Sequence, residues 1–216
     1  SDELKAYLGI VVILTTIITA KVYLGADVEN FEEAFRDSLF QVVSLITTTG
    51  FVSADYSQWA TSAQLMIFVL LFLGACAGST SGGIKLIRHL VFFKNSFLEF
   101  KRIIHPSAIV PMRINQEVVP GKIITHVFNF LLLYLALFVT GSVVLAMMGL
   151  DFMTAIGAMA TSLGNVGPGI GEVGPVDNFA WLPAHVKLFL SFVMLVGRLE
   201  IFTVLVLFTP YFWRLN

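Results

Sequence analysis

The stretch SLITTTGF, residues 44–51, ends an apolar helix-like run with three threonines and a glycine. Polar groups are costly in apolar surroundings unless they have a partner, so the meaning of this stretch depends on the solvent around it. Of the 216 residues, 57% are hydrophobic and only 12% are charged. A water-soluble fold of this size cannot hide that much apolar surface and still present a polar exterior. We therefore expect an all-α membrane protein.

Four segments are apolar enough to cross a bilayer, which requires about 20 predominantly apolar residues in a helix. These segments are residues 4–24, 64–84, 123–150 and 186–213. Two shorter runs, residues 30–45 and 152–163, each follow an outward span and precede an inward one. We predict that both enter the membrane from outside as half-membrane helices and turn back. Such re-entrant backbone is tolerated only where it lines a protein cavity or water.

The charges orient these spans. Seven of the thirteen Lys and Arg residues lie between the second and third spans: Lys85, Arg88, Lys94, Lys101, Arg102, Arg113 and Lys122. By the positive-inside rule this connection is cytoplasmic. Lys5 and Arg214 fall on the same side, so both ends of the chain are expected in the cytoplasm. Acidic residues collect on the opposite side: Asp27, Glu29, Glu32, Glu33, Asp37, Asp55, Asp151, Glu172 and Asp177.

The plan of span, half-helix, glycine turn and span occurs twice. An offset of 117 residues sets Gly50 against Gly167 and Phe35 against Phe152. We interpret the chain as two parallel copies of one unit. Residues 1–105 form the first repeat, residues 106–120 the cytoplasmic connection, and residues 121–216 the second repeat.

Both glycine turns are candidates for an ion filter. A partly dehydrated monovalent cation needs a cage of oxygens, which rings of backbone carbonyls supply in potassium channels. The candidate residues are Thr48, Thr49, Gly50 and Phe51 in the first copy, and Asn165, Val166, Gly167 and Pro168 in the second. Alternatively, each glycine only caps an interfacial helix. Matching positions in two copies favour the filter.

The second span carries the sequence GACAGSTSGG, residues 74–83. Its glycines at every fourth position fit close helix contacts, and this interpretation can hold for Gly74 and Gly78. Adjacent glycines and hydroxyls weaken a helix, so we favour an unwound segment beneath the filter, formed by Gly78, Ser79, Thr80, Ser81, Gly82 and Gly83.

Arg198 falls opposite Ser81 under the same offset. An arginine in mid-span costs at least about 2.5 kcal/mol on insertion scales, so it normally faces a partner or water. Glu200 is a poor partner, because helical residues two apart do not face each other. We expect Arg198 to point into a pore beside the segment of residues 78–83.

Four motifs together resemble the TrkH/TrkG/KtrB potassium-uptake family. In order they are SLITTTGF, GACAGSTSGGIKLIR (residues 74–88), GNVGPG (residues 164–169) and GRLEIFT (residues 197–203). The resemblance covers essentially the whole chain but only the later half of the family pattern, which has four repeats around one pore. It implies that Gly50 and Gly167 belong to the third and fourth filter segments, and that residues 78–83 form a gate. The fourth segment lacks a Thr-Thr-Gly pattern, as is usual in that family.

The resemblance also implies the setting and the partners. The location is the bacterial cytoplasmic (inner) membrane, the cargo is potassium, and no cofactor is expected in this chain. Partners are a cytosolic TrkA/KtrA-like nucleotide-binding regulatory subunit and, for the full-length protein, a second copy. Two filter segments cannot surround an ion, so either preceding repeats or a second chain must complete the ring.

The leading hypothesis is therefore potassium transport through a selectivity filter gated by an intramembrane loop. The alternatives are a non-conducting four-helix membrane scaffold and a sodium-permeable relative. An enzyme is disfavoured, because no nucleophile with its base and no metal-ligand spacing is found. Other polar and aromatic residues have simpler expectations. His89 and His105 are expected to be solvated, His126 and His185 interfacial, and Phe128, Phe130 and Phe138 in packing or lipid contact.

Overall fold

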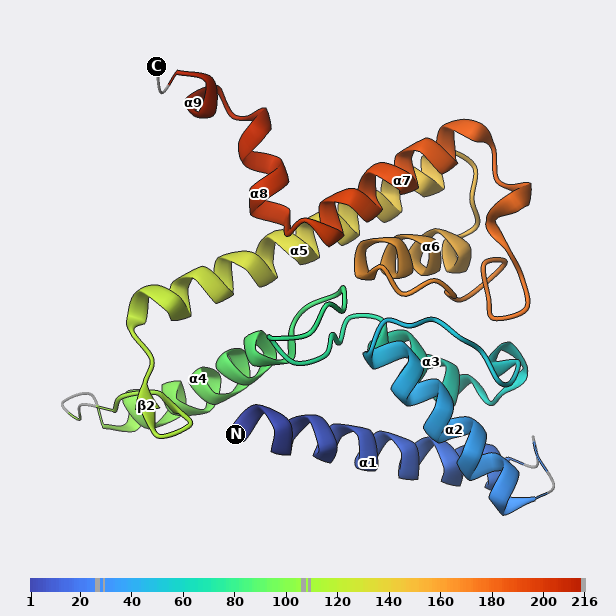
Figure 1. Ribbon diagram of the computed structural model, residues 1–216, viewed down its shortest axis with the longest axis horizontal. Helices are drawn as coiled ribbons and strands as arrows, with labels where there is room; N and C mark the ends of the chain where they lie inside the picture. The colour runs from blue at the N-terminus through green and yellow to red at the C-terminus, as the bar shows by residue number, and fades with distance from the viewer. Residues whose placement is uncertain (26–27, 29, 106–107, 109, 215–216) are drawn as a thin grey trace.

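The computed structural model describes residues 1–25, 28, 30–105, 108 and 110–214, and this part of the chain is mostly helical (Figure 1). Asp27 and Glu29, two of the predicted outward acids, lie outside the described residues, as does Pro106 at the predicted domain boundary.

Among the described residues, two helices are long and apolar enough to cross a membrane on their own: α1 (Asp2–Leu24) and α5 (Gly121–Met147). The two predicted half-membrane helices are α2 (Phe31–Ile46) and α6 (Phe152–Gly164). All four begin and end within a few residues of the predicted bounds. The prediction of helix in these segments is confirmed.

The start of α6 is fixed by an N-terminal cap. The Asp151 carboxylate accepts hydrogen bonds from the backbone amides of Met153 (3.0 Å) and Thr154 (3.2 Å). Hydrogen bonding from Thr154, with that from Met153, holds the pKa of the Asp151 carboxyl below its ordinary range. An anionic cap also suits the positive end of the helix dipole.

The second predicted span is interrupted earlier than expected. Helix α3 (Thr61–Leu70) ends before Leu71, and helical structure resumes only in α4 (Leu86–Ile104). Backbone bonds across the break replace the helical ones: Gly74 N donates to Ile84 O (2.8 Å), and Leu73 pairs with Ile84 in a parallel bridge. The interpretation of Gly74 and Gly78 as helix-contact glycines is wrong, because this segment is not helical.

The fourth predicted span, residues 186–213, is not continuous. It consists of α7 (Ala184–Arg198) and α8 (Ile201–Leu205), followed by η3 (Val206–Phe208) and α9 (Pro210–Trp213). The axis bends by 115° at the break, and α8 turns away from the line of α7 (Figure 1). The break falls at Glu200, whose φ of 60° is incompatible with a right-handed helix.

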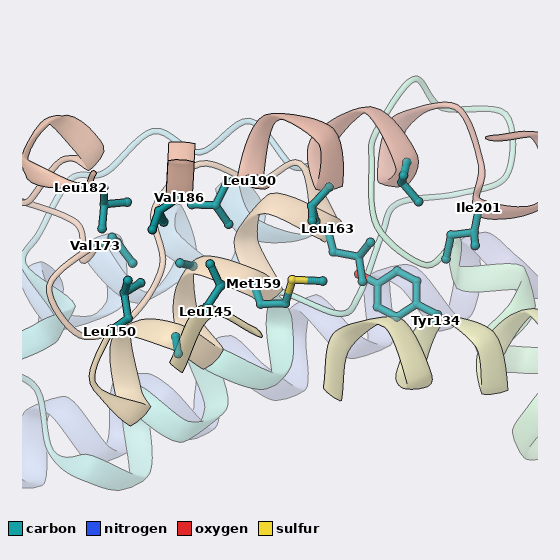
Figure 2. Packing of buried hydrophobic residues seen from close by; sticks show 14 of the residues in the cluster. Tyr134, Leu145, Leu150, Met159, Leu163, Val173, Leu182, Val186, Leu190 and Ile201 are labelled. Atoms are coloured by element: carbon teal, nitrogen blue, oxygen red, sulfur yellow. The ribbon is translucent and has the colours of Figure 1, made fainter. Parts of the chain in front are cut away.

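Two large hydrophobic clusters hold the helices together, and a smaller one around Val91, Met112 and Ile114 packs α4 against the segment that follows it. One joins α5, α6 and α7, and Figure 2 shows Leu145, Met159 and Leu190 from these helices meeting in it. The other joins α1, α2 and α3, and it includes Val166 and Ile170 from the segment after α6. The second cluster therefore ties the two halves of the chain together.

The segment between the second and third predicted spans packs beside the start of the chain. It contains α4 and a short hairpin of β1 (Arg113–Ile114) and β2 (Glu117–Val118). Lys94 on α4 forms an ion pair with Asp2 (2.8 Å), whose backbone amide donates to Asn115 Oδ1 (2.6 Å). Figure 1 shows the N-terminus, α4 and β2 at one end of the molecule.

His89 differs from its expectation. It is half-buried, and its Nε2 lies 3.3 Å from the carbonyl oxygen of Phe72 in the interruption between α3 and α4. The expectation of a solvated side chain is wrong, since the unwound segment leaves a carbonyl for the imidazole to contact. His105 is exposed, as expected; His126 and His185, predicted to be interfacial, are exposed as well.

Tyr56, in the short helix η1 (Tyr56–Gln58), provides a polar link between the halves. Its hydroxyl is buried and donates a hydrogen bond to the carbonyl of Gly169 (2.8 Å). Tyr56→Phe leaves that carbonyl without its donor, and we expect a loss of about 1–2 kcal/mol in stability. The measurement is the apparent Tm in detergent. Tyr23→Phe, at a residue that is 43% exposed, is the control and is expected to leave the Tm unchanged. Equal Tm values for both variants would contradict a structural link at Gly169.

Candidate functional site

Helix α2 ends in a paired hydrogen-bond arrangement. The backbone amide of Thr49 donates to Ser44 O (2.9 Å), and that of Thr48 donates to Leu45 O (3.1 Å). This is the pattern of a Schellman motif, in which the residue after the helix adopts a left-handed conformation. Thr48 does so, with a φ of 54°. A β-branched residue rarely adopts this conformation, so the turn is held by its surroundings.

Helix α6 ends in the same arrangement at the positions 117 residues later. The amide of Val166 donates to Thr161 O (3.0 Å), and that of Asn165 donates to Ser162 O (3.2 Å). Asn165 has a φ of 54°, identical to that of Thr48. Two residues further on, Gly50 and Gly167 have φ values of 75° and 122°. Both glycines thus adopt a positive φ, which a residue without a Cβ reaches at no steric cost.

A helix hydroxyl supports each turn. Ser44 Oγ donates to the carbonyl of Phe51 (2.7 Å), and Thr161 Oγ1 accepts from the amide of Gly167 (2.9 Å). Ser44 and Thr161 are both buried and occupy equivalent positions on α2 and α6. Each hydroxyl fixes the segment that follows the turn against the helix that precedes it.

The two turns meet each other directly. A Cβ on Gly50 would overlap the carbonyl oxygen of Val166, and one on Gly167 would lie 3.8 Å from the Cα of Gly50. The structure thus brings residues of the two predicted filter segments together. Phe51 lies outside this contact and is 70% exposed.

The unwound segment, here called loop 74–84 after its first and last residues, packs under both helix ends. The amide of Gly82 donates to Thr48 Oγ1 (2.9 Å). A Cβ on Gly82 would overlap the carbonyl oxygen of Gly164 and lie 2.9 Å from Asn165 Cβ. The Thr48 hydroxyl therefore faces the loop. Gly78 has no such neighbour, since a Cβ there would meet no atom within 4 Å among the described residues.

A polar cavity of about 370 Å³ borders the loop. Its lining includes Ser79, Thr80, Ser81, Gly82 and Gly83 of the loop, and Lys85, Arg88, Arg198 and Glu200. Arg198 thus lies on the same cavity as the residues with which it was predicted to act. Gly78, the remaining member of the predicted set, does not contribute to this lining.

Sequence reasoning missed the partner of Glu200. Its carboxylate forms an ion pair with Arg88 (2.8 Å), whose guanidinium also lies 3.8 Å from the centre of the Phe130 ring. The pair links the start of α4 to the break between α7 and α8. Pairing between distant segments leaves no periodic signal in the sequence.

Lys85 and Glu3 were also missed as contacts of the loop. Lys85 Nζ donates to the carbonyls of Ser79 and Ser81, and Glu3 Oε1 accepts from the amide of Ala77 (2.7 Å). Lys85 directly follows the Gly-Gly-Ile sequence. Its place next to the loop in the sequence could have predicted this contact.

Known proteins with similar sequences and structures identify the class. The sequence profile of TrkH, described as a cation transport protein, matches residues 7–214. The chain is 39% identical over 211 residues to the Trk system potassium uptake protein TrkH of Halomonas elongata, which covers 98% of this chain and 42% of that protein. It is 44% identical over 176 residues to TrkI of the same organism, covering 81% of this chain and 36% of that protein.

The fold of the chain also matches that of a solved structure. The crystal structure of the potassium transporter TrkH from Vibrio parahaemolyticus superposes with a TM-score of 0.91 at 35% identity, covering 98% of this chain and 45% of that one. Fold and sequence together place the chain in the class of helical membrane proteins to which these relatives belong. The chain belongs to the TrkH family. It spans less than half the length of the relatives that it matches.

The packing of loop 74–84 predicts different outcomes for two glycines of the same loop. Gly82→Ala places a methyl group against backbone atoms of Gly164, so the loop must move and we expect a lower apparent Tm. Gly78→Ala, the matched control, adds a methyl group in open space and is expected to leave the Tm near that of the parent. Thermal unfolding of both purified variants measures this difference. Equal losses in the two variants would overturn the packing of Gly82.

Proposed function

We propose that this chain forms two sides of a potassium pathway, with backbone oxygens of residues 48–51 and 165–168 as the filter. The observation that carries the proposal is the contact between two equivalent turns at Gly50 and Val166. Backbone carbonyls in such turns are the groups that replace the hydration shell of potassium. The relatives named above are potassium uptake proteins and a potassium transporter, which favours potassium over sodium as the cargo.

The proposed repeat is supported by backbone conformations at matched positions. The same offset of 117 residues relates Thr48 to Asn165 and Gly50 to Gly167, all with positive φ. It also relates Gly83 (φ 67°) to Glu200 (φ 60°), where the second span of each proposed unit is broken. Residues with a positive φ therefore stand at matched positions in two segments of unlike sequence. Helix capping alone does not account for all of these matches, which supports the repeat.

The remaining sides of the pathway are proposed to come from segments homologous to the other parts of the longer relatives, or from a second chain. Orientation follows the charges, with both termini on the cytoplasmic side of a bacterial inner membrane. The ion pair between Asp2 and Lys94 supports this, because it places the start of α1 beside α4. The basic α4 and its hairpin then face a cytosolic regulatory subunit of the TrkA/KtrA type, and the complete protein forms a homodimer.

Loop 74–84 is proposed to act as the gate below the filter. It contacts the ends of both pore helices, through Thr48 Oγ1 and through the backbone of Gly164. Arg198 lies on the cavity at the loop, where a positive charge opposes the passage of a cation. A closed loop and an adjacent arginine together give two barriers in series.

The filter assignment is tested by replacing its glycines. Gly50→Ala and Gly167→Ala force alanine into a positive φ, which costs roughly 1–3 kcal/mol, and Gly50→Ala also displaces the Val166 carbonyl. We expect potassium flux or potassium-to-sodium selectivity in liposomes to fall by roughly tenfold or more. Gly9→Ala, in α1 with no atom near the new methyl group, is the control. Full activity and selectivity of both filter variants would favour the non-conducting scaffold. Equal potassium and sodium flux in the parent would favour the sodium-permeable relative.

The role of Arg198 is tested by removing its charge. Arg198→Ala is expected to raise potassium flux severalfold, because a cation no longer passes a fixed positive charge at the cavity. The measurement is tracer uptake into liposomes over a series of salt concentrations. Salt screens the repulsion between Arg198 and the cation in the parent, and the variant has no such repulsion to screen. Arg214→Ala, distant from the cavity lining, serves as control. Unchanged flux in correctly folded Arg198→Ala protein counts against a role in gating.

A further inference from the structure

The side chain of Lys85 turns back into loop 74–84. Its Nζ donates to the carbonyl of Ser79 (2.8 Å), to the carbonyl of Ser81 and to Ser81 Oγ (3.1 Å). Ser79 Oγ lies 3.4 Å away on the same side. The ammonium is therefore surrounded by two carbonyl and two hydroxyl oxygens from two residues of the loop.

This cluster of four oxygens, here called the loop cage, has the chemistry of a monovalent cation site. Carbonyl and hydroxyl oxygens replace the hydration shell of an alkali cation, and a lysine ammonium is a compact monovalent cation with three donor hydrogens. The cage offers more acceptors than the ammonium has hydrogens. The chain's own cation thus fills a set of oxygens suited to a permeating one.

The other contacts of the loop show what the ammonium adds. At the base, Gly74 N donates to Ile84 O (2.8 Å) and Leu86 N donates to Ala75 O (3.2 Å). At the top, the amide of Gly82 donates a hydrogen bond to Thr48 Oγ1. These bonds fix the base and the contact with the filter turn. Between them, Ser81 Oγ accepts from the amide of Ala75 (3.2 Å) and Ser79 Oγ donates to the carbonyl of Cys76 (2.7 Å). Lys85 adds the bonds that tie Ser79 and Ser81 to the start of α4.

The surrounding cations oppose the binding of the ammonium in the loop cage. Arg88 and Arg198 line the same cavity as Lys85, and two further positive charges weaken the hold on a third. The two nearby carboxylates are already engaged, Glu200 with Arg88 and Glu3 with the amide of Ala77. Oxygens hold the ammonium in place while its cationic neighbours oppose it.

We propose that Lys85 is the positioning residue that latches loop 74–84: its ammonium fills the loop cage in the closed state and leaves it when the loop opens, freeing those oxygens for the passing cation. This inference rests on the proposed function, because a latch has meaning only if the loop is a gate. The residue acts on the loop and is not itself part of the filter.

Two substitutions at Lys85 separate a latch from a simple charge barrier. Lys85→Met removes the charge and the cage contacts, whereas Lys85→Arg keeps the charge but presents a larger, planar group that the cage does not fit. We expect both variants, in the intact transporter, to raise potassium flux into liposomes by roughly fivefold or more. A rise in Lys85→Met alone, with Lys85→Arg at the parent level, would overturn the latch in favour of charge repulsion.

A second readout reports on the loop without using transport. Cys76 lies in the loop and is partly buried, so its rate of modification by neutral N-ethylmaleimide measures loop opening. Both Lys85 variants are expected to react severalfold faster, and Lys122→Met, which removes an exposed cation at the start of α5, is expected to match the parent. If the Lys85 variants fail to fold, Ser81→Ala decides, because it removes one cage oxygen and retains the lysine. It is expected to speed the reaction to a smaller extent.

The outcomes separate the two proposals. A parent protein that carries potassium, together with Lys85 and Ser81 variants of unchanged flux and Cys76 reactivity, refutes the latch and leaves the proposed function standing. A parent that carries no potassium refutes the proposed function itself. A faster Cys76 reaction without a change in flux refutes the claim that the latch controls the gate.

Discussion

The close approach of Gly50 to the carbonyl of Val166 is the constraint on which the rest of the structure depends. It is possible only because residue 50 has no Cβ, and it places two equivalent turns side by side at the ends of α2 and α6. The Schellman bonds at both helix ends and the hydroxyls of Ser44 and Thr161 fix the turns in this position. The contact joins the two helix ends at the residues proposed as the filter.

Contacts between residues distant in sequence also fix the loop next to the turns. Thr48 adopts an unfavourable left-handed conformation, and its hydroxyl accepts a bond from Gly82. The turn that shapes the proposed filter therefore also holds the proposed gate. Around the loop, Glu3, Lys85 and the pair of Arg88 with Glu200 connect α1, α4 and the bend between α7 and α8. A movement of α4 or α8 would therefore displace the loop through these contacts.

The sequence predicts those parts of this fold that depend on local composition. Apolar length predicted α1 and α5, and the order of helix and glycine located the turns after α2 and α6. The break at Leu71 was placed too late, because it depends on a close approach between the Leu71 carbonyl and Gly164, a residue distant in sequence. The bend at Glu200 was missed for a similar reason, since its ion pair is with Arg88. Local periodicity cannot predict contacts between residues that are distant in sequence.

The most direct test of the account is to locate the cation itself. Crystals of the intact protein grown with rubidium or thallium, which scatter anomalously, report monovalent cation positions independently of transport assays. We expect anomalous density between the carbonyls of residues 48–51 and those of residues 165–168. Density confined to other positions, with these carbonyls free of cations at saturating concentration, would contradict it.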